Sequence, residues 1–172
     1  MIIWISGLSG SGKTTIGCHL AALWKKKAAN VVIVDGDRVR QLLDLGDYKI
    51  DYTIESRRYV AEKIHTLCAW LDEQDVNVVC CTISLFDELH LKNRRIFSKY
   101  FEVLLSVPIK VLYERDDKNL YAPALRGDIK NVVGVDIPFS PPSNPDMIID
   151  NCKYSENLEA FAAEILDKAT AS

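Results

Sequence analysis

Short apolar runs alternate with longer segments of helical period along the whole chain. Five runs are rich in isoleucine, valine and leucine, and we predict them as strands over 2–6, 31–34, 76–82, 101–107 and 147–149. The segments between them repeat apolar residues every three or four positions. They predict helices over 14–27, 54–71 and, more weakly, 87–100, and a last helix that Ser155 caps and whose apolar stripe runs from Leu158 to Leu166. This alternation is typical of an α/β fold with a five-stranded parallel sheet covered on both faces.

The stretch 116–145 follows neither period. It is rich in residues that interrupt regular structure: Pro123, Pro138, Pro141, Pro142, Pro145, Gly127 and Gly134. Loops this long inside compact domains are usually functional lids or disordered. The basic residues Arg115, Lys118 and Lys130 favour a lid that closes over phosphates. At 172 residues and with no internal repeat, the chain is predicted to form one domain over 1–172 with a lid at about 116–145.

The balance of charges points to small ligands. Lysine and arginine total 21 against 24 aspartate and glutamate residues, a net charge of −3, which argues against nucleic acid or a membrane surface as the main partner. No apolar run approaches a membrane span and no secretory pattern precedes the first strand, so a cytoplasmic protein is expected. The five cysteines lack C-x-x-C spacing and are predicted to be reduced thiols that pack as small apolar groups.

A glycine-rich segment, GLSGSGKTT over 7–15, lies between the first predicted strand and the first predicted helix. Glycines allow positive φ and leave backbone N–H groups accessible, and the helix N-terminus adds partial positive charge, so this turn suits a phosphate. The segment matches G-x-x-x-x-G-K-[ST], in which Lys13 would reach the β- and γ-phosphates of a nucleoside triphosphate and the Thr14 hydroxyl would ligate Mg²⁺. Such a P-loop predicts the phosphate donor but leaves the acceptor open.

Two carboxylates follow the second predicted strand, in the segment VDGDRVR. Asp35 and Asp37 would lie at the same sheet edge as the glycine-rich loop, because open α/β sheets bind ligands at the carboxyl ends of their strands. Asp35 could then help to hold hydrated Mg²⁺, and Asp37 could orient or deprotonate an acceptor hydroxyl. A DGD turn without a catalytic role is the alternative that these residue types leave open.

Three segments together carry a resemblance: GLSGSGKTT, DGDRVR and RDDKNLYAPALRGDIKNVVGVDIPFSPPSNPDMIID. From Ile2 to about Asn151 the chain resembles the adenylyl-sulfate kinase family, and the K-x-L-Y, G-x-I-K and G-V-D-x-P elements of the predicted lid are far more specific than the P-loop. The resemblance implies a P-loop NTPase-type three-layer α/β/α sandwich. It also implies Mg²⁺-dependent transfer of the γ-phosphate of ATP to a ribose 3′-hydroxyl, with nucleotides as the partners. Members are often dimers, so a homodimer is one expected assembly.

The resemblance also implies roles for individual residues. Asp37 matches the aspartate assigned to catalysis, and Arg40 matches an arginine that contacts the anionic group of the acceptor. The expected catalytic residues are Asp37, Lys13 and Lys130. The expected ATP-binding residues are Gly7, Ser9, Gly10, Ser11, Gly12, Lys13, Thr14, Thr15, Arg115 and Lys118. The expected metal-binding residues are Thr14 and, through water, Asp35. The expected acceptor-binding residues are Asp37, Arg40, Tyr48, Tyr52, Ser84, Phe86, Lys130 and Val132.

The acceptor segments depart from the family pattern. Aligned without gaps, the chain has Asp47, Tyr52 and Glu55 where the family has a phenylalanine, an arginine and an asparagine, and it has Val132 where the family's lid supplies a second phenylalanine. In the family the two phenylalanines sandwich the acceptor adenine. Since stacking on an aromatic side chain contributes about 1–3 kcal/mol per base, their loss would weaken adenine binding unless Tyr48 or Tyr52 substitutes. The changes also remove donors to an anionic sulfate.

We therefore expect a kinase whose preferred acceptor is another 5′-modified nucleotide with a free 3′-hydroxyl. Cytidine diphosphoramidate kinase, a related activity in bacterial capsule modification, fits this expectation, because a smaller pyrimidine does not need the two-phenylalanine sandwich. Three alternatives stay open. The first is a true adenylyl-sulfate kinase that makes 3′-phosphoadenylyl sulfate, the second a non-catalytic nucleotide-binding switch, and the third a kinase for a small non-nucleotide alcohol, which would need a smaller pocket than the lid implies.

Overall fold

A parallel five-stranded sheet forms the centre of the fold. The computed structural model describes residues 1–45, 52–116, 118–153 and 158–171. Its strands are β1 (Ile2–Ser6), β2 (Val31–Asp35), β3 (Asn77–Thr82), β4 (Tyr100–Ser106) and β5 (Met147–Asp150). They lie in the order β2-β3-β1-β4-β5, and each neighbouring pair is parallel. The predicted fold class and the predicted strands are confirmed, with ends that differ by at most one residue.

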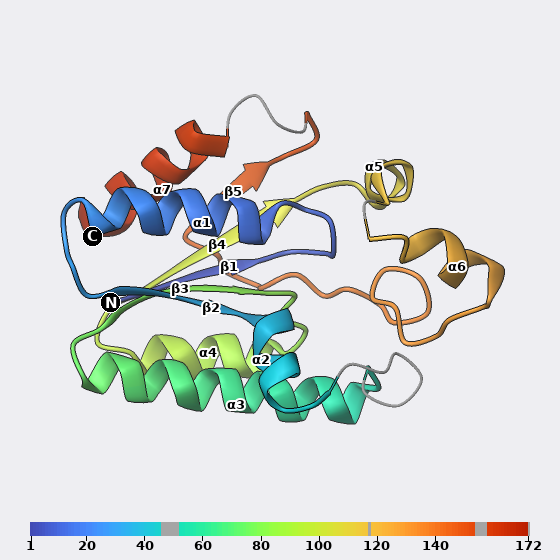
Figure 1. The fold of residues 1–172 in the computed structure, drawn as a ribbon, viewed down its shortest axis with the longest axis horizontal. Coiled ribbons are helices and arrows are strands. Elements are labelled where there is room, and N and C mark those ends of the chain that lie inside the picture. Colours follow the sequence, from blue (N-terminus) through green and yellow to red (C-terminus); the bar gives the residue numbers. More distant parts are fainter. Residues whose placement is uncertain (46–51, 117, 154–157, 172) are drawn as a thin grey trace.

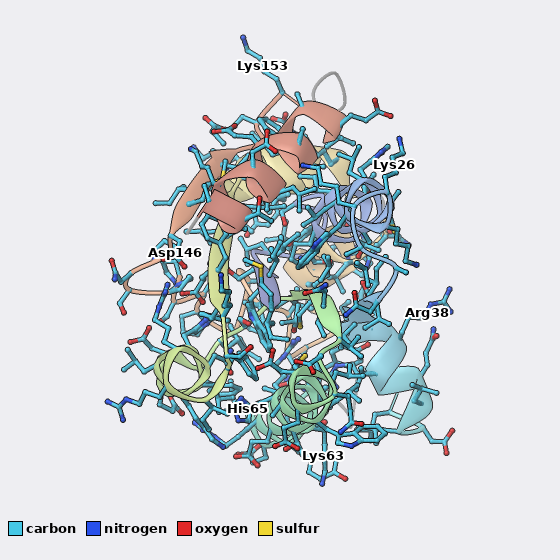
Figure 2. The ribbon with its side chains drawn as sticks, turned by 90° about the vertical axis from the view of Figure 1, so that its left-hand side faces the viewer. Lys26, Arg38, Lys63, His65, Asp146 and Lys153 are labelled. Carbon is cyan, nitrogen blue, oxygen red and sulfur yellow. The ribbon has the colours of Figure 1, made fainter. Side chains whose placement is uncertain are left out.

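Helices cover both faces of this sheet (Figure 1). On one face lie α1 (Lys13–Lys25) and α7 (Leu158–Ala171), and on the other lie α3 (Ile54–Glu73) and α4 (Asp87–Ile96). Figure 2 looks at the molecule from the left-hand side of Figure 1 and shows the same layers, with His65 between α3 and α4. A central parallel strand covered in this way must be apolar throughout, and β1 is buried at every position.

Two apolar clusters fill the spaces between the three layers. Alternate residues of β1 contribute to both, because successive side chains of a strand point to opposite faces. Ile3 and Ile5 pack in the cluster under α1 and α7, whereas Ile2 and Trp4 pack in the cluster under α3. The packing brings the carboxyl ends of β1, β2 and β3 to one edge, where α2 (Gly36–Leu42) begins (Figure 1).

Sequence analysis missed short helices. Among the described residues these are α2, α5 (Ile109–Arg115) and α6 (Tyr121–Arg126), each at most seven residues long. A helix of two turns or fewer shows little apolar periodicity, and local hydrogen bonds start it instead. The Asp35 carboxylate accepts from the backbone N–H groups of Asp37 and Arg38 and so caps α2. The stretch predicted as irregular, 116–145, therefore contains a helix, α6.

The predicted helix 87–100 is wrong at its C-terminal end. The helix stops at Ile96 and Phe97 is extended, with φ −72° and ψ 139°. Ser98 then bonds to the Asp72 carboxylate at the end of α3, with 2.7 Å from its backbone nitrogen and 2.8 Å from its hydroxyl. These bonds turn the chain into β4, which begins at Tyr100. The predicted cap Ser155 lies outside the described residues.

The five cysteines differ in burial, and Cys152, after β5, is half-buried. Cys68, Cys80 and Cys81 are buried thiols in the apolar clusters, as predicted, and burial raises the pKa of Cys81 to about 12. Cys18 is exposed on α1, so the prediction of apolar packing is wrong for this residue. None of the helices within the described ranges combines the length and the apolar character needed to span a bilayer.

A third apolar cluster connects the lid to the body of the protein. It includes Leu8 of the P-loop together with Leu112, Val132 and Ile137, all at most 8% exposed. The hydroxyl of Tyr121 on α6 adds a hydrogen bond to the carbonyl of Ser9, 2.9 Å away. The segment after α5 therefore packs directly against the P-loop, at the end of the sheet where the strands terminate (Figure 1).

Candidate active site

The P-loop joins β1 to α1 through a backbone that requires glycine. Gly12 caps α1 with φ 96°, a conformation that other residues rarely adopt. A side chain there would also place its Cβ atom 2.8 Å from the amide nitrogen of Asn151. That nitrogen donates to the carbonyl of Ser11 at 2.9 Å, so the residue after β5 holds the loop in place. The N-terminus of α1 thus opens into the site, where it can receive a phosphate.

Lys13 stands at the start of α1 with its amine turned back over the loop. The amine donates to the carbonyl of Leu8 at 2.7 Å. Burial, with the nearby charge of Lys118, lowers the pKa of Lys13 to about 8, although Asp37 and Asp35 partly offset this. A bound phosphate would relieve the cost of holding this cation away from water.

Thr14 and Asp35 place two oxygen groups beside the P-loop. The Thr14 hydroxyl donates to one carboxylate oxygen of Asp35 at 2.7 Å, while the other oxygen caps α2. A hydroxyl and a carboxylate are hard oxygen ligands of the kind that Mg²⁺ prefers, often with water completing its coordination. The pair therefore fits the predicted metal position, with Thr14 as direct ligand and Asp35 acting through water.

Asp37 lies in the first turn of α2 and pairs with the lid. Its carboxylate accepts from the amine of Lys118 at 2.7 Å, and more than half of each side chain is exposed. Burial would raise the pKa of Asp37, but the hydrogen bond and charge of Lys118, together with Lys13 and Arg40, lower it below the ordinary value. Asp37 is thus a stable carboxylate that faces the phosphate-binding residues.

Tyr52 and Phe86 line the part of the site farther from the P-loop, and each carries a guanidinium group over its ring. The Arg40 group lies 4.4 Å from the ring centroid of Tyr52, and the Arg58 group lies 4.2 Å from that of Phe86. Such cation–π contacts orient the arginines as well as the rings. Between these groups, Ser84 accepts a 2.7 Å hydrogen bond from the indole N–H of Trp4.

One cavity of about 200 Å³ brings these groups together. Of the predicted site residues it is lined by Ser9, Gly10, Gly12, Lys13, Thr14, Thr15, Asp35, Asp37, Arg40, Tyr52, Ser84, Phe86 and Lys118. Residues that were predicted to bind phosphate, metal and acceptor therefore face a common space. Cationic side chains outnumber carboxylates along its wall, which suits an anionic ligand.

The remaining predicted residues that the structure describes do not line this cavity. Gly7 and Ser11 shape the P-loop from behind, and Arg115 donates to the carbonyls of Asn151 and Cys152 at 2.8 and 2.7 Å. Lys130 is exposed on the lid. Val132 is 1% exposed in the third apolar cluster, and its neighbour Val133 lines the cavity instead. Tyr48 and Asp47 lie outside the described residues, and Glu55 is exposed in the first turn of α3.

Sequence analysis missed Arg57, which lines the cavity although it is only 8% exposed. A signal was present in the pattern. Arg57 precedes Val60 by three positions and Ile64 by seven, so it lies on the apolar stripe of α3 where a charge needs polar partners. Asn151 was also missed, because it follows a strand distant in sequence from the loop that it supports.

Comparisons with known proteins agree with this site. The sequence model described as adenylylsulphate kinase matches residues 1–150. A cytidine diphosphoramidate kinase of Campylobacter jejuni is 40% identical over 168 residues, 97% of this chain and 95% of the relative. An adenylyl-sulfate kinase of Halothermothrix orenii is 34% identical over 167 residues, 96% and 86% of the two chains. The structure of a Mycobacterium tuberculosis adenylyl-sulfate (APS) kinase in complex with AMPPNP and APS has a TM-score of 0.85 at 26% identity, over 99% of this chain and 97% of that one.

The matched region contains the cavity and the residues that line it. It begins at the first residue, includes the P-loop and the Asp37–Lys118 pair, and extends to the end of β5 at Asp150. The relatives are kinases, so the predicted type of enzyme, a phosphotransferase that acts on a hydroxyl group of a nucleotide, is confirmed. With a family match over most of the chain and relatives more than 30% identical across it, the chain belongs to the adenylyl-sulfate kinase family.

Proposed function

We propose that the protein transfers the γ-phosphate of ATP to the ribose 3′-hydroxyl of cytidine diphosphoramidate. The observation that carries the proposal is the composition of the cavity wall beyond the P-loop. In the part of the chain that the structure describes, that wall contains the aliphatic Val133 and the rings of Tyr52 and Phe86, each with an arginine guanidinium over it, in place of the expected phenylalanine pair. The 40% identity to a cytidine diphosphoramidate kinase over 97% of the chain supports the same acceptor.

Asp37 and Lys118 exchange partners in the proposed reaction. Their side chains form an ion pair at 2.7 Å. When ATP binds, its phosphates attract Lys118, and Asp37 becomes available to the acceptor hydroxyl. The 3′-oxygen then forms a bond to the γ-phosphorus while the bond from that phosphorus to the β,γ-bridging oxygen breaks, the hydroxyl proton passes to Asp37, and ADP leaves. Losing the charge of Lys118 raises the pKa of Asp37 toward the value that a base needs.

The other cations act by position and charge. Lys13 neutralises the β- and γ-phosphates, and Thr14 with Asp35 would hold Mg²⁺, which when bound would neutralise charge on the phosphates. Lys130 acts from the lid, whose closure would bring it from its exposed position toward the acceptor. Arg115, at the end of α5, acts indirectly, because its guanidinium donates to the carbonyls of Asn151 and Cys152 behind the P-loop. Since phosphoryl transfer has a loose transition state, positioning and electrostatics supply most of the catalysis.

Adenylyl sulfate is the second candidate acceptor. The 34% identity to an adenylyl-sulfate kinase over 96% of the chain favours it, as does the similarity to a structure that contains APS. A non-catalytic switch is disfavoured, because Asp37 faces the phosphate-binding residues and a switch needs no such carboxylate. Three cationic side chains of the wall, Lys13, Arg40 and Lys118, also suit a nucleotide better than a small uncharged alcohol.

Coupled ADP release tests the proposal. The protein is assayed with Mg·ATP against cytidine diphosphoramidate, CDP, CMP and adenylyl sulfate, and phosphorus NMR locates the new phosphate. The proposal expects the highest kcat/KM on cytidine diphosphoramidate and a new 3′-phosphate. A higher kcat/KM on adenylyl sulfate would replace the proposed acceptor with the second candidate. ADP release that no acceptor stimulates would leave the nucleotide switch as the better explanation.

A further inference from the structure

Arg57 is a buried cation in the first turn of α3, and its burial needs an explanation. Its side chain lines the cavity, while the residues that follow it on the same face of α3, Val60 and Ile64, are apolar. A guanidinium group is stable in such a place only if hydrogen bonds replace its water. An aliphatic side chain could fill this position of the apolar stripe of α3 without any hydrogen bonds. Packing therefore does not explain why the residue is charged.

The Arg57 guanidinium joins two segments that are far apart in the sequence. Its Nε atom donates to the carbonyl of Tyr52 at 2.9 Å, on the acceptor side of the cavity. Its Nη2 atom donates to the carbonyl of Asn131 at 2.7 Å, in the lid 74 residues away. The guanidinium carbon also lies 5.2 Å from the ring centroid of Tyr52. One planar fork therefore holds the entry to α3 and the lid together.

The lid segment that receives this bond is a rigid unit. Residues 131–137, here called the lid ring, close on themselves. The backbone N–H groups of Asn131 and Val132 both donate to the Asp136 carboxylate at 2.6 Å, and Val133 bridges to Ile137. The hydroxyl of Tyr113, on α5, donates to the carbonyl of Gly134 at 2.9 Å and so connects the lid ring to that helix. The hydrogen bond from Arg57 to the carbonyl of Asn131 therefore holds the lid ring as a whole.

We propose that Arg57 is a positioning residue that couples the acceptor side of the cavity to the lid and thereby sets the place of Lys130. Lys130 directly precedes the lid ring, and Val133 of the ring lines the cavity. The bond to Asn131 therefore determines how far the lid stands from Tyr52, which is the wall that an acceptor touches. This inference rests on the proposed function, because it assigns Lys130 a part in the transfer.

The test uses Arg57→Lys, which keeps the charge but cannot form the two-armed fork. The matched control is Arg126→Lys, a lid arginine that pairs on the surface with Asp128 at 2.9 Å. Steady-state kinetics with ATP and acceptor are measured for both. A displacement of about 1 Å costs about a hundredfold in such reactions, so Arg57→Lys should lower acceptor kcat/KM by about 10- to 100-fold with ATP KM within about twofold, and the control should match wild type.

A double-mutant cycle separates positioning from a general structural role. If Arg57 acts by placing Lys130, then Arg57→Lys should change kcat/KM by less than about twofold when Lys130→Ala is already present. An equal loss on both backgrounds would overturn the inference. So would an Arg57→Lys variant that behaves like the Arg126→Lys control.

Hydrogen exchange of the lid ring gives a readout that does not depend on any acceptor. Arg57→Lys should speed amide exchange in 131–137 at least about tenfold, and unchanged exchange would overturn the inference. Faster exchange in a protein that phosphorylates no acceptor of the panel would instead reject the proposed function and keep the coupling. If Arg57→Lys does not fold, Arg57→Gln, which removes the charge and cannot form the two-armed fork to Tyr52 and Asn131, is measured in the same way, with the same outcomes deciding.

Discussion

Replacing Asp37 by asparagine removes the carboxylate that the proposed mechanism requires and keeps the shape of the side chain. The amine of Lys118 loses the charge of its partner at 2.7 Å, while the cap of α2 is untouched, because that cap belongs to Asp35. The structure therefore allows a catalytic role and a structural role of Asp37 to be separated by their magnitudes.

The two roles predict very different free energies. The side chains of Asp37 and Lys118 are 60% and 55% exposed, and an exposed ion pair contributes about 0.2–1 kcal/mol to stability. A positioned base contributes about 10²–10⁴ to the rate, which is about 3–5 kcal/mol of transition-state stabilisation. The free energy of unfolding of Asp37→Asn should therefore lie within about 1 kcal/mol of the wild-type value. Its acceptor-dependent kcat should be lower by a factor of about 10²–10⁴.

The assay pairs urea unfolding with acceptor-stimulated ADP release and with calorimetric titration of Mg·ATP. Asp128→Asn is the matched control, because Asp128 forms a similarly exposed lid ion pair with Arg126 at 2.9 Å. Mg·ATP affinity should change little in Asp37→Asn, and kcat of the control should equal that of wild type. A loss of less than about tenfold in kcat, or an equal loss in the control, would refute Asp37 as the group that receives the proton.

Three further predictions follow from the P-loop. Because the pKa of Lys13 is lowered to about 8 and phosphates bind its charged form, the Kd for Mg·ATP should stay flat below about pH 7 and rise toward tenfold per pH unit above about pH 8. Calorimetry across that range checks this, and a flat profile at alkaline pH would contradict it. Thr14→Val should raise the Mg²⁺ concentration for half-maximal activity by about 10- to 100-fold, as seen in a metal titration, and Thr14→Ser should restore most of the affinity. Gly12→Ala, strained at φ 96° and pressed against Asn151, should lower the free energy of unfolding by about 1–3 kcal/mol in urea, more than Gly127→Ala, where φ is 82° and no atom lies within 4 Å.

Much of the fold was readable from the sequence because burial imposes a period. Each strand of the sheet is an apolar run, since both its faces are covered, and the long helix α3 shows its buried stripe from Arg57 to Cys68. The short helices α2, α5 and α6 have no room for such a stripe. The start of α2 depends on two local bonds to the Asp35 carboxylate, which the same residues could equally make in a turn.

The phosphate end of the site was also readable, because its residues belong to contiguous motifs. Lys13 and Thr14 follow a strand directly, and Asp35 and Asp37 follow another. Since parallel strands end at the same edge, placing both motifs together needed only the fold class. The 2.7 Å bond between Thr14 and Asp35 agrees with that expectation.

Local period and local spacing encode the sheet, its covering layers and the chemistry of the P-loop, so these features could be predicted from the residues alone. The acceptor wall and the lid could not, because they depend on long-range packing. There Val132 turns into the apolar cluster while Val133 faces the cavity, and Arg57 reaches Asn131 across 74 residues. An irregular segment has no repeat of apolar residues that would predict which side chain points inward. A hydrogen bond between segments distant in sequence forms only after the packing of the whole chain has brought them together.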